Sequence, residues 1–171
     1  MKNVRNMTYS ALMAALLVVC GWIAIPIPPV SFTLQTFGVL TALGVLGGKW
    51  GSISVILYLA MGLVGLPVFS GFSGGFSLLL GPTGGFLMAF PVMAWLCARF
   101  SGAARRAKIL AGLAGLLIVY LLGAAGLAWS AGMSWFQALA VGALPFVWKD
   151  ALSIVGAEWL AAVLKKRGLL R

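Results

Sequence analysis

The chain has 171 residues, of which 63% are hydrophobic and only 8% charged; twelve Lys and Arg, two acidic residues and no histidine give a formal net charge of +10. A water-soluble domain of this length needs far more charge on its surface, so the composition is typical of an integral membrane protein. It argues against nucleic-acid binding, which uses basic residues on a solvated face interleaved with aromatic residues. Here the basic residues stand in small groups between hydrophobic runs.

The hydrophobic runs predict an all-α integral membrane protein that forms a single transmembrane domain over residues 1–171. Six transmembrane helices are expected, near residues 7–25, 34–48, 51–68, 84–100, 108–128 and 146–165. The first run resembles a signal peptide in its basic start. Its length of about 19 residues suits a membrane span, and no small-residue cleavage pattern precedes Pro26, so we expect this run to be retained.

The basic residues fall on one side of these predicted spans. With a cytoplasmic N-terminus, eleven of the twelve lie on the cytoplasmic side: Lys2, Arg5, Lys49, Arg99, Arg105, Arg106, Lys108, Lys165, Lys166, Arg167 and Arg171. The positive-inside rule therefore predicts that both termini are cytoplasmic. The same charges would meet anionic lipids of the inner leaflet, which accounts for the high net charge. Lys149 is the exception.

Small residues form a stripe on the first predicted span. Ala11 and Ala15 lie four residues apart, with Ala14 beside them, and such spacing lets another helix approach closely. Internal packing and contact with a partner helix both fit this pattern. Cys20 and Cys97 fall inside apolar runs and are interpreted as packing residues, without a disulfide or metal role.

The first outer connection, "PIPPVSFT", is stiffened by three prolines and followed by Gln35. A glutamine amide both donates and accepts hydrogen bonds, so Gln35 can recognise an amide-like or urea-like ligand. An ordinary polar residue at the membrane interface, satisfied by water, is an equally good interpretation. The sequence leaves these two alternatives open.

The third connection, "FSGFSGGFSLLLGPTG", is a glycine-rich outer loop between the third and fourth predicted helices, and it carries no charge. Its aromatic and aliphatic content argues against disorder and favours a folded lid or binding loop. A phosphate-binding loop is excluded because no lysine follows the glycines and no strand precedes them. Thr83, Gly84 and Gly85 are instead expected to let the backbone come close to a small ligand.

Lys149 and Asp150 begin the last predicted helix at its outer end. The helix dipole favours an acid in this first turn but disfavours a lysine, and charged groups at membrane depth mark a substrate or ion site by default. An interfacial lysine beside a capping aspartate is the simpler alternative. Glu158 lies eight residues further on, about 12 Å along the helix axis, which is too far to form a catalytic pair with Asp150.

The sequence lacks the groups that acid–base catalysis needs. Acid–base catalysis needs paired titratable groups, and the chain has no histidine, two separated acids and cysteines inside apolar runs. We therefore expect no catalytic residues, no metal site and no cofactor. A ligand-binding or transport role is favoured over an enzyme.

Three motifs carry a resemblance to a known family: "FTLQT" after the proline-rich loop, "GLPVFSGFSGGFSLLLGPTGGFLMAFP", and "ALPFVWKD". Together they resemble the BioY family, the biotin-binding S components of energy-coupling factor (ECF) transporters. The resemblance covers about the whole chain. It implies a six-helix protein of a prokaryotic cell membrane that captures biotin at the outer face, beneath the outer loops, and hydrolyses nothing itself.

The resemblance also implies residues and partners. The expected substrate-binding residues are Gln35, Gly74, Gly75, Thr83, Gly84, Lys149, Asp150 and Ser153. Many relatives have a lysine at the position of Ser153, and Lys149, one turn earlier on the same helix face, can reach the same pocket. The expected protein partners are a transmembrane coupling subunit of the EcfT or BioN type, docked on Ala11 and Ala15, and two ABC ATPases. The alternative is an S component for another vitamin or a biotin precursor.

Overall fold

The structure, a computed structural model, describes residues 2–167, so Met1 and Arg171 lie outside the described residues. Its elements follow the order α1 (Lys2–Trp22), β1 (Ala24–Ile25), β2 (Phe32–Thr33), α2 (Gln35–Leu63), η1 (Ser70–Phe72), η2 (Phe76–Leu80), α3 (Gly84–Arg99), α4 (Arg105–Ala131), α5 (Trp135–Gly142) and α6 (Val147–Lys166). The strands form one short antiparallel pair, and η1 and η2 are 3-10 turns. The prediction of an all-α protein built from several apolar helices is confirmed.

Helix α2 is broken at Gly47, which has a positive φ of 77° that side-chain-bearing residues rarely adopt. Beyond this point the chain folds back on itself. A Cβ atom added to Gly51 would lie 2.7 Å from the Cα atom of Leu43, although eight residues of straight helix would span about 12 Å. The two halves, 35–46 and 48–63, correspond to the second and third predicted spans, and the second half ends earlier than the predicted residue 68.

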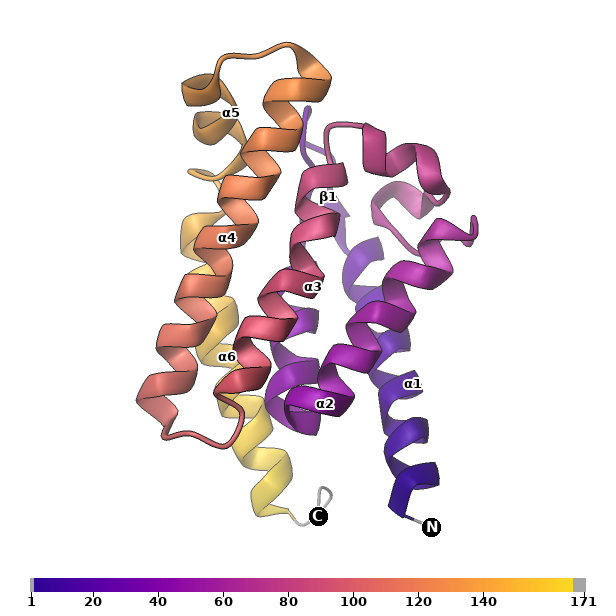
Figure 1. Cartoon of the computed structure of the whole chain (residues 1–171), viewed down its shortest axis with the longest axis vertical. Helices are drawn as coiled ribbons and strands as arrows, with labels where there is room; N and C mark the ends of the chain where they lie inside the picture. Colours follow the sequence, from indigo (N-terminus) through magenta and orange to yellow (C-terminus); the bar gives the residue numbers. More distant parts are fainter. Residues whose placement is uncertain (1, 168–171) are drawn as a thin grey trace.

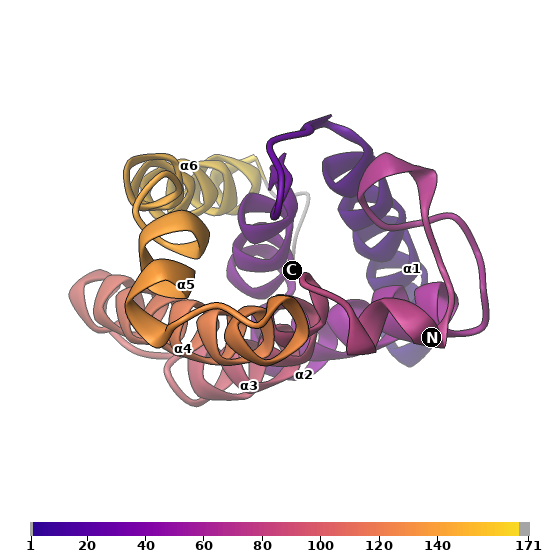
Figure 2. The same cartoon turned by 90° about the horizontal axis from the view of Figure 1, so that it is seen from above.

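The helices form a bundle whose long axis runs vertically in Figure 1. The first half of α2 lies in the middle of this bundle when it is seen from above, in Figure 2, and its residues Val39 and Ala42 are fully buried. The start of α1, the break in α2, the turn between α3 and α4 and the end of α6 all lie at one end of the molecule. The short strands, the 3-10 turns and α5 lie at the other end.

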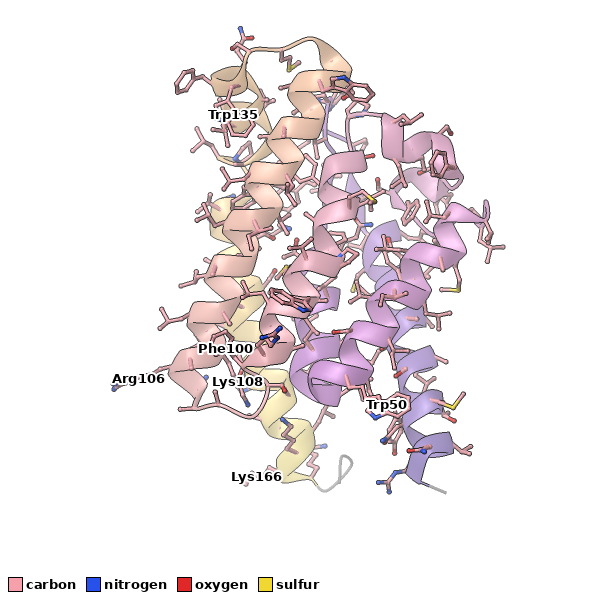
Figure 3. All side chains as sticks on the ribbon, in the orientation of Figure 1. Trp50, Phe100, Arg106, Lys108, Trp135 and Lys166 are labelled. Carbon is pink, nitrogen blue, oxygen red and sulfur yellow. The ribbon has the colours of Figure 1, made fainter. Side chains whose placement is uncertain are left out.

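The charged residues separate along this axis. Arg106, Lys108 and Lys166 lie at the end that holds the start of α1, while Trp135 of α5 lies at the opposite end (Figure 3). We call the first the basic end and the second the loop end. The arrangement agrees with the one-sided distribution of basic residues in the sequence, because the predicted cytoplasmic connections all meet at the basic end.

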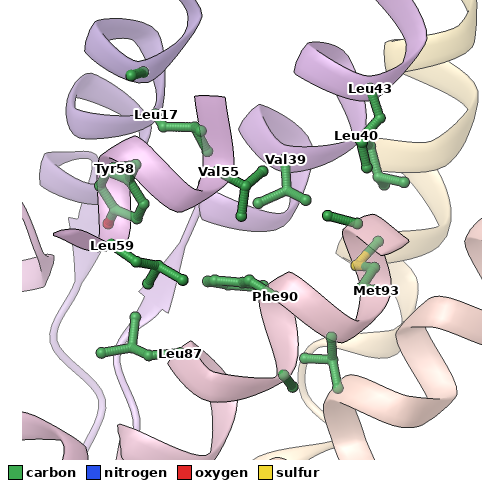
Figure 4. Close-up of a cluster of buried hydrophobic side chains, with 14 of the residues drawn as sticks. Leu17, Val39, Leu40, Leu43, Val55, Tyr58, Leu59, Leu87, Phe90 and Met93 are labelled. Carbon is green, nitrogen blue, oxygen red and sulfur yellow. The ribbon is translucent and has the colours of Figure 1, made fainter. Parts of the chain in front are cut away.

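The main core joins α1, both halves of α2, α3, α4 and α6. Figure 4 labels ten of its side chains, namely Leu17, Val39, Leu40, Leu43, Val55, Tyr58, Leu59, Leu87, Phe90 and Met93. The outer surface is also apolar, as shown by Leu117 and Trp159, which are 58% and 63% exposed. Apolar side chains on the outside suit a bundle whose solvent is lipid.

Within residues 2–167, three helices are long and apolar enough to cross a membrane: Asn3–Trp22, Gln35–Leu63 and Arg105–Ala131. The pair α5 and α6, bent by 50°, adds a fourth if it is taken as one span, and α3 is apolar but shorter. The interval between the predicted helices 108–128 and 146–165 needs correction, because it contains the helix α5. It begins at a capping box in which Ser134 and Gln137 satisfy each other's backbone N–H groups.

Candidate ligand-binding site

A cavity of about 60 Å³ lies at the loop end, between α2, α3, α4, α6 and the outer connections. A single buried water needs roughly 10–15 Å³ on this scale, so the cavity is much larger than a water site. Its lining includes four of the predicted binding residues, Gln35, Thr83, Lys149 and Asp150. Residues that are far apart in the sequence are thus brought to one place.

Lys149 and Asp150 form a buried ion pair in the wall of this cavity. They are 7% and 3% exposed, and the Lys149 ammonium group contacts the Asp150 Oδ1 atom directly. The ammonium also donates to the backbone carbonyl of Thr33 at 2.8 Å and lies 5.3 Å from the centre of the Phe32 ring. Lys149 therefore fixes the first outer connection to α6 while it neutralises the aspartate.

Tyr120 of α4 completes the surroundings of the aspartate. Its hydroxyl donates a hydrogen bond of 2.7 Å to the Asp150 Oδ2 atom, and Tyr120 also lines the cavity. A carboxylate offers about four acceptor positions. Here Oδ2 accepts one hydrogen bond from Tyr120, while Oδ1 lies beside the Lys149 ammonium but accepts no hydrogen bond within the described residues. Asp150 therefore keeps capacity to accept hydrogen bonds from a ligand. Tyr120 is not predictable from the sequence, where its only signal is a polar hydroxyl in the middle of an apolar run.

Gln35 is held by a second chain of hydrogen bonds, which meets the contacts of Lys149 at Thr33. Its Oε1 atom accepts from the Thr33 hydroxyl at 3.0 Å, and its Nε2 atom donates to the hydroxyl of Tyr58 at 2.5 Å. The Tyr58 hydroxyl in turn donates to the carbonyl of Val68 at 3.3 Å. The amide is thus fixed in orientation and is tied, through Tyr58, to the loop that follows α2. Tyr58, like Tyr120, was missed from the sequence.

The glycine-rich loop closes the cavity through Phe69, Ser70 and Ser73, which belong to its lining. The Phe69 ring occupies the space above Gly62, where an added Cβ atom would lie only 2.0 Å from the ring. Trp22 of α1 donates from its indole nitrogen to the carbonyl of Pro67 at 2.8 Å. The loop is therefore folded and anchored, as a lid over the cavity would be.

Aromatic rings supply the apolar walls. Phe86, Phe90 and Phe146 line the cavity together with Phe69. Phe86 packs directly over Gly123 of α4, where an added Cβ atom would lie 2.2 Å from its ring. Flat apolar walls combined with a few fixed polar groups are typical of small-molecule sites.

Four predicted binding residues do not line the cavity: Gly74, Gly75, Gly84 and Ser153. The glycines let backbone segments approach one another. An added Cβ atom would lie 2.1 Å from the Leu66 carbonyl oxygen at Gly74 and 1.9 Å from that of Leu79 at Gly84.

The other two of these residues also have partners within the protein. Gly75 has a φ of 107° and donates its N–H to the Gly62 carbonyl. The Ser153 hydroxyl donates to the carbonyl of Lys149 at 3.0 Å, which is a bond within α6. Gly75 and Ser153 are therefore placed to support the loop and the helix that carry lining residues.

Two further groups of predicted residues lie elsewhere. Ala11 and Ala15 are exposed on α1, whereas their neighbour Ala14 is buried against the core. Glu158 lies far from Asp150 and lines a small separate cavity with Cys97 and Lys108. Both cysteines are free, and within residues 2–167 no group of His, Cys, Asp and Glu could hold a metal ion.

The fold and the cavity define a class: an integral membrane protein whose helices enclose a partly polar ligand site at one end, beneath a folded loop. Residues 1–169 match the BioY family, and the chain belongs to this family.

The relatives cover nearly the whole chain. It is 40% identical to the biotin transporter BioY of Thermotoga maritima, over 95% of this chain and 96% of that protein. It is 39% identical to the probable biotin transporter BioY of Pyrococcus horikoshii, over 94% and 96%. A crystal structure of the S-component for biotin from an ECF-type ABC transporter matches with a TM-score of 0.88 and 31% identity, over 96% of this chain and 93% of that one.

Proposed function

We propose that this protein is the biotin-binding and uptake subunit of an ECF-type transporter. The observation that carries the proposal is the buried pair of Lys149 and Asp150, set in a cavity with aromatic walls, in a chain that shares its fold with an S component for biotin. The relatives are named as transporters, so the protein is a substrate-binding subunit and not an enzyme. ATP hydrolysis belongs to other subunits.

The chemistry of the cavity fits biotin. The ureido ring of biotin carries two N–H donors and one carbonyl acceptor, and its thiophane ring and alkyl chain need apolar contacts. In this proposal Asp150 accepts from the ureido N–H groups, and Gln35 or Thr83 provides the remaining hydrogen bonds. Phe86 and Phe146 pack against the apolar part of the ligand.

In this proposal Lys149 neutralises the negative charge of the Asp150 carboxylate. Its ion pair with Asp150 and its hydrogen bond to the Thr33 carbonyl hold the ammonium in the cavity wall, which supports this role over direct contact with the ligand carboxylate. The hydroxyl groups of Ser31 and Ser70 line the same cavity and can donate to that carboxylate. The lysine that many relatives carry at the position of Ser153 is thus replaced by a lysine one turn earlier.

The proposal includes a topology of six membrane-spanning helices in the cell membrane of a prokaryote, with residues 1–171 as one domain and both termini in the cytoplasm. The fold-back of α2 at Gly47 supports the count, because each half then crosses separately. The gathering of Arg106, Lys108 and Lys166 at one end supports the orientation, because cytoplasmic connections are rich in Lys and Arg.

The partners in this proposal are an EcfT- or BioN-type coupling subunit and two ABC ATPases. An ECF-type transporter is the setting of the structurally similar S component. The exposed pair Ala11 and Ala15 on α1 supports docking of a partner helix, since Ala14 and Ser10 already supply the small residues that pack inside the bundle.

The decisive experiment measures biotin binding to purified protein carrying Asp150→Asn. The change keeps the size of the side chain but removes the charged acceptor and leaves Lys149 without its partner. A hydrogen bond to a charged group contributes about 1.5–3 kcal/mol, so affinity should fall by about 10- to 100-fold. Glu158→Gln, at the other acid, is the matched control and should bind as the unchanged protein does. Equal affinity of Asp150→Asn and the unchanged protein would contradict the proposal.

The alternative ligand, another vitamin or a biotin precursor, is tested with the same protein. Radiolabelled biotin, desthiobiotin and riboflavin are compared in equilibrium binding. Biotin should bind more tightly than riboflavin because the polar groups of the cavity suit its cyclic urea. It should also bind more tightly than desthiobiotin, which keeps the urea but lacks the thiophane ring that the aromatic walls contact. Tighter binding of desthiobiotin or riboflavin would favour the alternative.

A further inference from the structure

A second cavity, of about 260 Å³, lies at the basic end, remote from the biotin site. Three segments form it: Asn6 and Tyr9 come from α1, Lys165 comes from α6, and Val45, Leu46, Gly47 and Trp50 come from the break in α2. Nothing in the proposed capture of biotin uses this cavity. Its position beside the ends of α1 and α6 places it at the membrane interface of the bundle.

The walls of this cavity are fixed by packing between the segments. The Ser10 hydroxyl of α1 donates to the carbonyl of Trp50 at 3.0 Å, and the Ser54 hydroxyl donates to the same carbonyl. Gly48 packs against the backbone of α3, where an added Cβ atom would lie 2.8 Å from the Cα of Ala98. The break in α2 is therefore held against α1 and α3 by contacts within the protein.

The lining combines one cation with polar and apolar groups. Lys165 is exposed and contributes an ammonium group, and Asn6 contributes a side-chain amide. Trp50 is half-buried, and the ammonium of Lys49 lies 5.6 Å from the centre of its ring. Val45 and Leu46 add apolar surface. Cations and amide donors suit a phosphate, while tryptophan and aliphatic side chains suit the start of an acyl chain.

The cavity opens on a different side of α1 from the surface suited to a partner helix. Successive residues of an α-helix turn by about 100°, which places Asn6 and Tyr9 roughly opposite Ala11 and Ala15, with the buried Ser10 and Ala14 between the two faces. A partner helix on Ala11 and Ala15 would leave the cavity free. The cavity would then face the surrounding lipid, which could occupy it.

We propose that this cavity binds the headgroup of an anionic phospholipid, with Lys165 contacting the phosphate, Asn6 donating to it and Trp50 packing against the glycerol and upper acyl region. The site is independent of biotin and goes beyond the capture of the vitamin. One bound lipid would join α1, the break in α2 and α6 at the basic end. It would thereby fix the position of α1 relative to the rest of the bundle.

The test uses native mass spectrometry of the delipidated full-length protein with equal amounts of phosphatidylglycerol and phosphatidylcholine. The unchanged protein should retain one phosphatidylglycerol in preference to phosphatidylcholine. Lys165→Gln should lower the phosphatidylglycerol affinity by about fivefold, the effect of removing one cation near an anionic headgroup. Lys166→Gln removes the same charge from the adjacent residue, which does not line the cavity, and should retain the affinity of the unchanged protein.

Three outcomes would overturn the proposal. Equal losses in Lys165→Gln and Lys166→Gln would mean that diffuse charge, and not this cavity, attracts the lipid. Complete displacement of phosphatidylglycerol by inorganic phosphate would define a site for free phosphate instead. Unchanged lipid binding by Lys165→Gln, together with loss of assembly with the ATPase-bound coupling subunit, would assign the cavity to a protein contact. Thermal unfolding of both variants checks that each is folded.

Discussion

The hydroxyl of Tyr120 donates a 2.7 Å hydrogen bond to the carboxylate of Asp150, so that α4 holds the acid that α6 contributes. Lys149 contacts the other oxygen of the same carboxylate. Asp150 is therefore fixed from two sides, and its remaining acceptor positions have defined directions. Tyr120 lines the cavity as well, so its influence on a ligand is both direct and through Asp150.

Replacing Tyr120 by Phe should weaken biotin binding without unfolding the protein. The change removes only the hydroxyl, so Asp150 loses one donor while the ring remains to pack. A hydrogen bond to a charged group contributes about 1.5–3 kcal/mol, and the expected loss is about tenfold or more in affinity. Equilibrium binding of labelled biotin measures it, with Tyr9→Phe at the basic end as the matched control. An unchanged affinity in Tyr120→Phe would show that Asp150 does not need this donor.

The effects of substituting Lys149 and Asp150 on thermal stability should not be additive. Removing either partner leaves a buried charge unpaired, which typically costs about 3–5 kcal/mol, whereas removing both leaves no charge to compensate. We expect Lys149→Met and Asp150→Asn each to lower the midpoint of thermal unfolding in detergent. The double variant should be more stable than either single variant. Additive losses in the double variant would mean that the two residues act independently.

The contact between Phe69 and Gly62 should hold the glycine-rich loop in place over the cavity. Gly62→Ala places a methyl group where the Phe69 ring lies, 2.0 Å from its nearest atom, so the ring and its loop must move. Overpacking of this kind typically costs about 1–3 kcal/mol. Biotin should bind less tightly and dissociate faster, because Phe69, Ser70 and Ser73 all line the cavity. Dissociation of labelled biotin after dilution measures the effect.

Two further variants separate this displacement from a general effect of alanine. Gly102→Ala lies in the turn before α4, where an added Cβ atom meets nothing within 4 Å, and it should release biotin at the rate of the unchanged protein. Adding Phe69→Leu to Gly62→Ala replaces the rigid ring by a smaller, adaptable side chain. It should restore part of the stability lost in Gly62→Ala. A double variant less stable than Gly62→Ala would argue against a clash at this position.

The charged part of the site was predictable because charge is rare in this chain. Lys149 and Asp150 interrupt an apolar run, and a buried charge there needs a partner or a purpose. Tyr58 and Tyr120 were not predictable in the same way. A tyrosine in an apolar span is equally typical of a lipid interface, and only the packing of helices decides which face of a span points inward.

The glycines at the end of the loop show a different limit to what the sequence can predict. Their number predicts that the backbone comes close to another group, for which we expect a small ligand, but the sequence does not determine which group approaches. At Gly84 the neighbour is the carbonyl of Leu79, and at Gly85 it is the carbonyl of Leu122 on α4, 2.3 Å from an added Cβ atom. Backbone approaches backbone at these positions. By contrast, α5 had a readable signal in the sequence, since Ser134 and Gln137 have the spacing of a capping box.

The orientation of the protein in the membrane can be tested at the two ends of α4. Ala104 precedes this helix at the basic end and Ala131 is its last residue, and both are exposed. In a protein with Cys20 and Cys97 replaced by Ala, Ala131→Cys should react with a membrane-impermeant maleimide on intact cells. Ala104→Cys should react only after lysis, because the positive-inside rule puts the basic end in the cytoplasm. If only Ala104→Cys reacted on intact cells, the topology would be the inverse of the one proposed, with the biotin site on the cytoplasmic side. If both cysteines reacted on intact cells, α4 would not span the membrane.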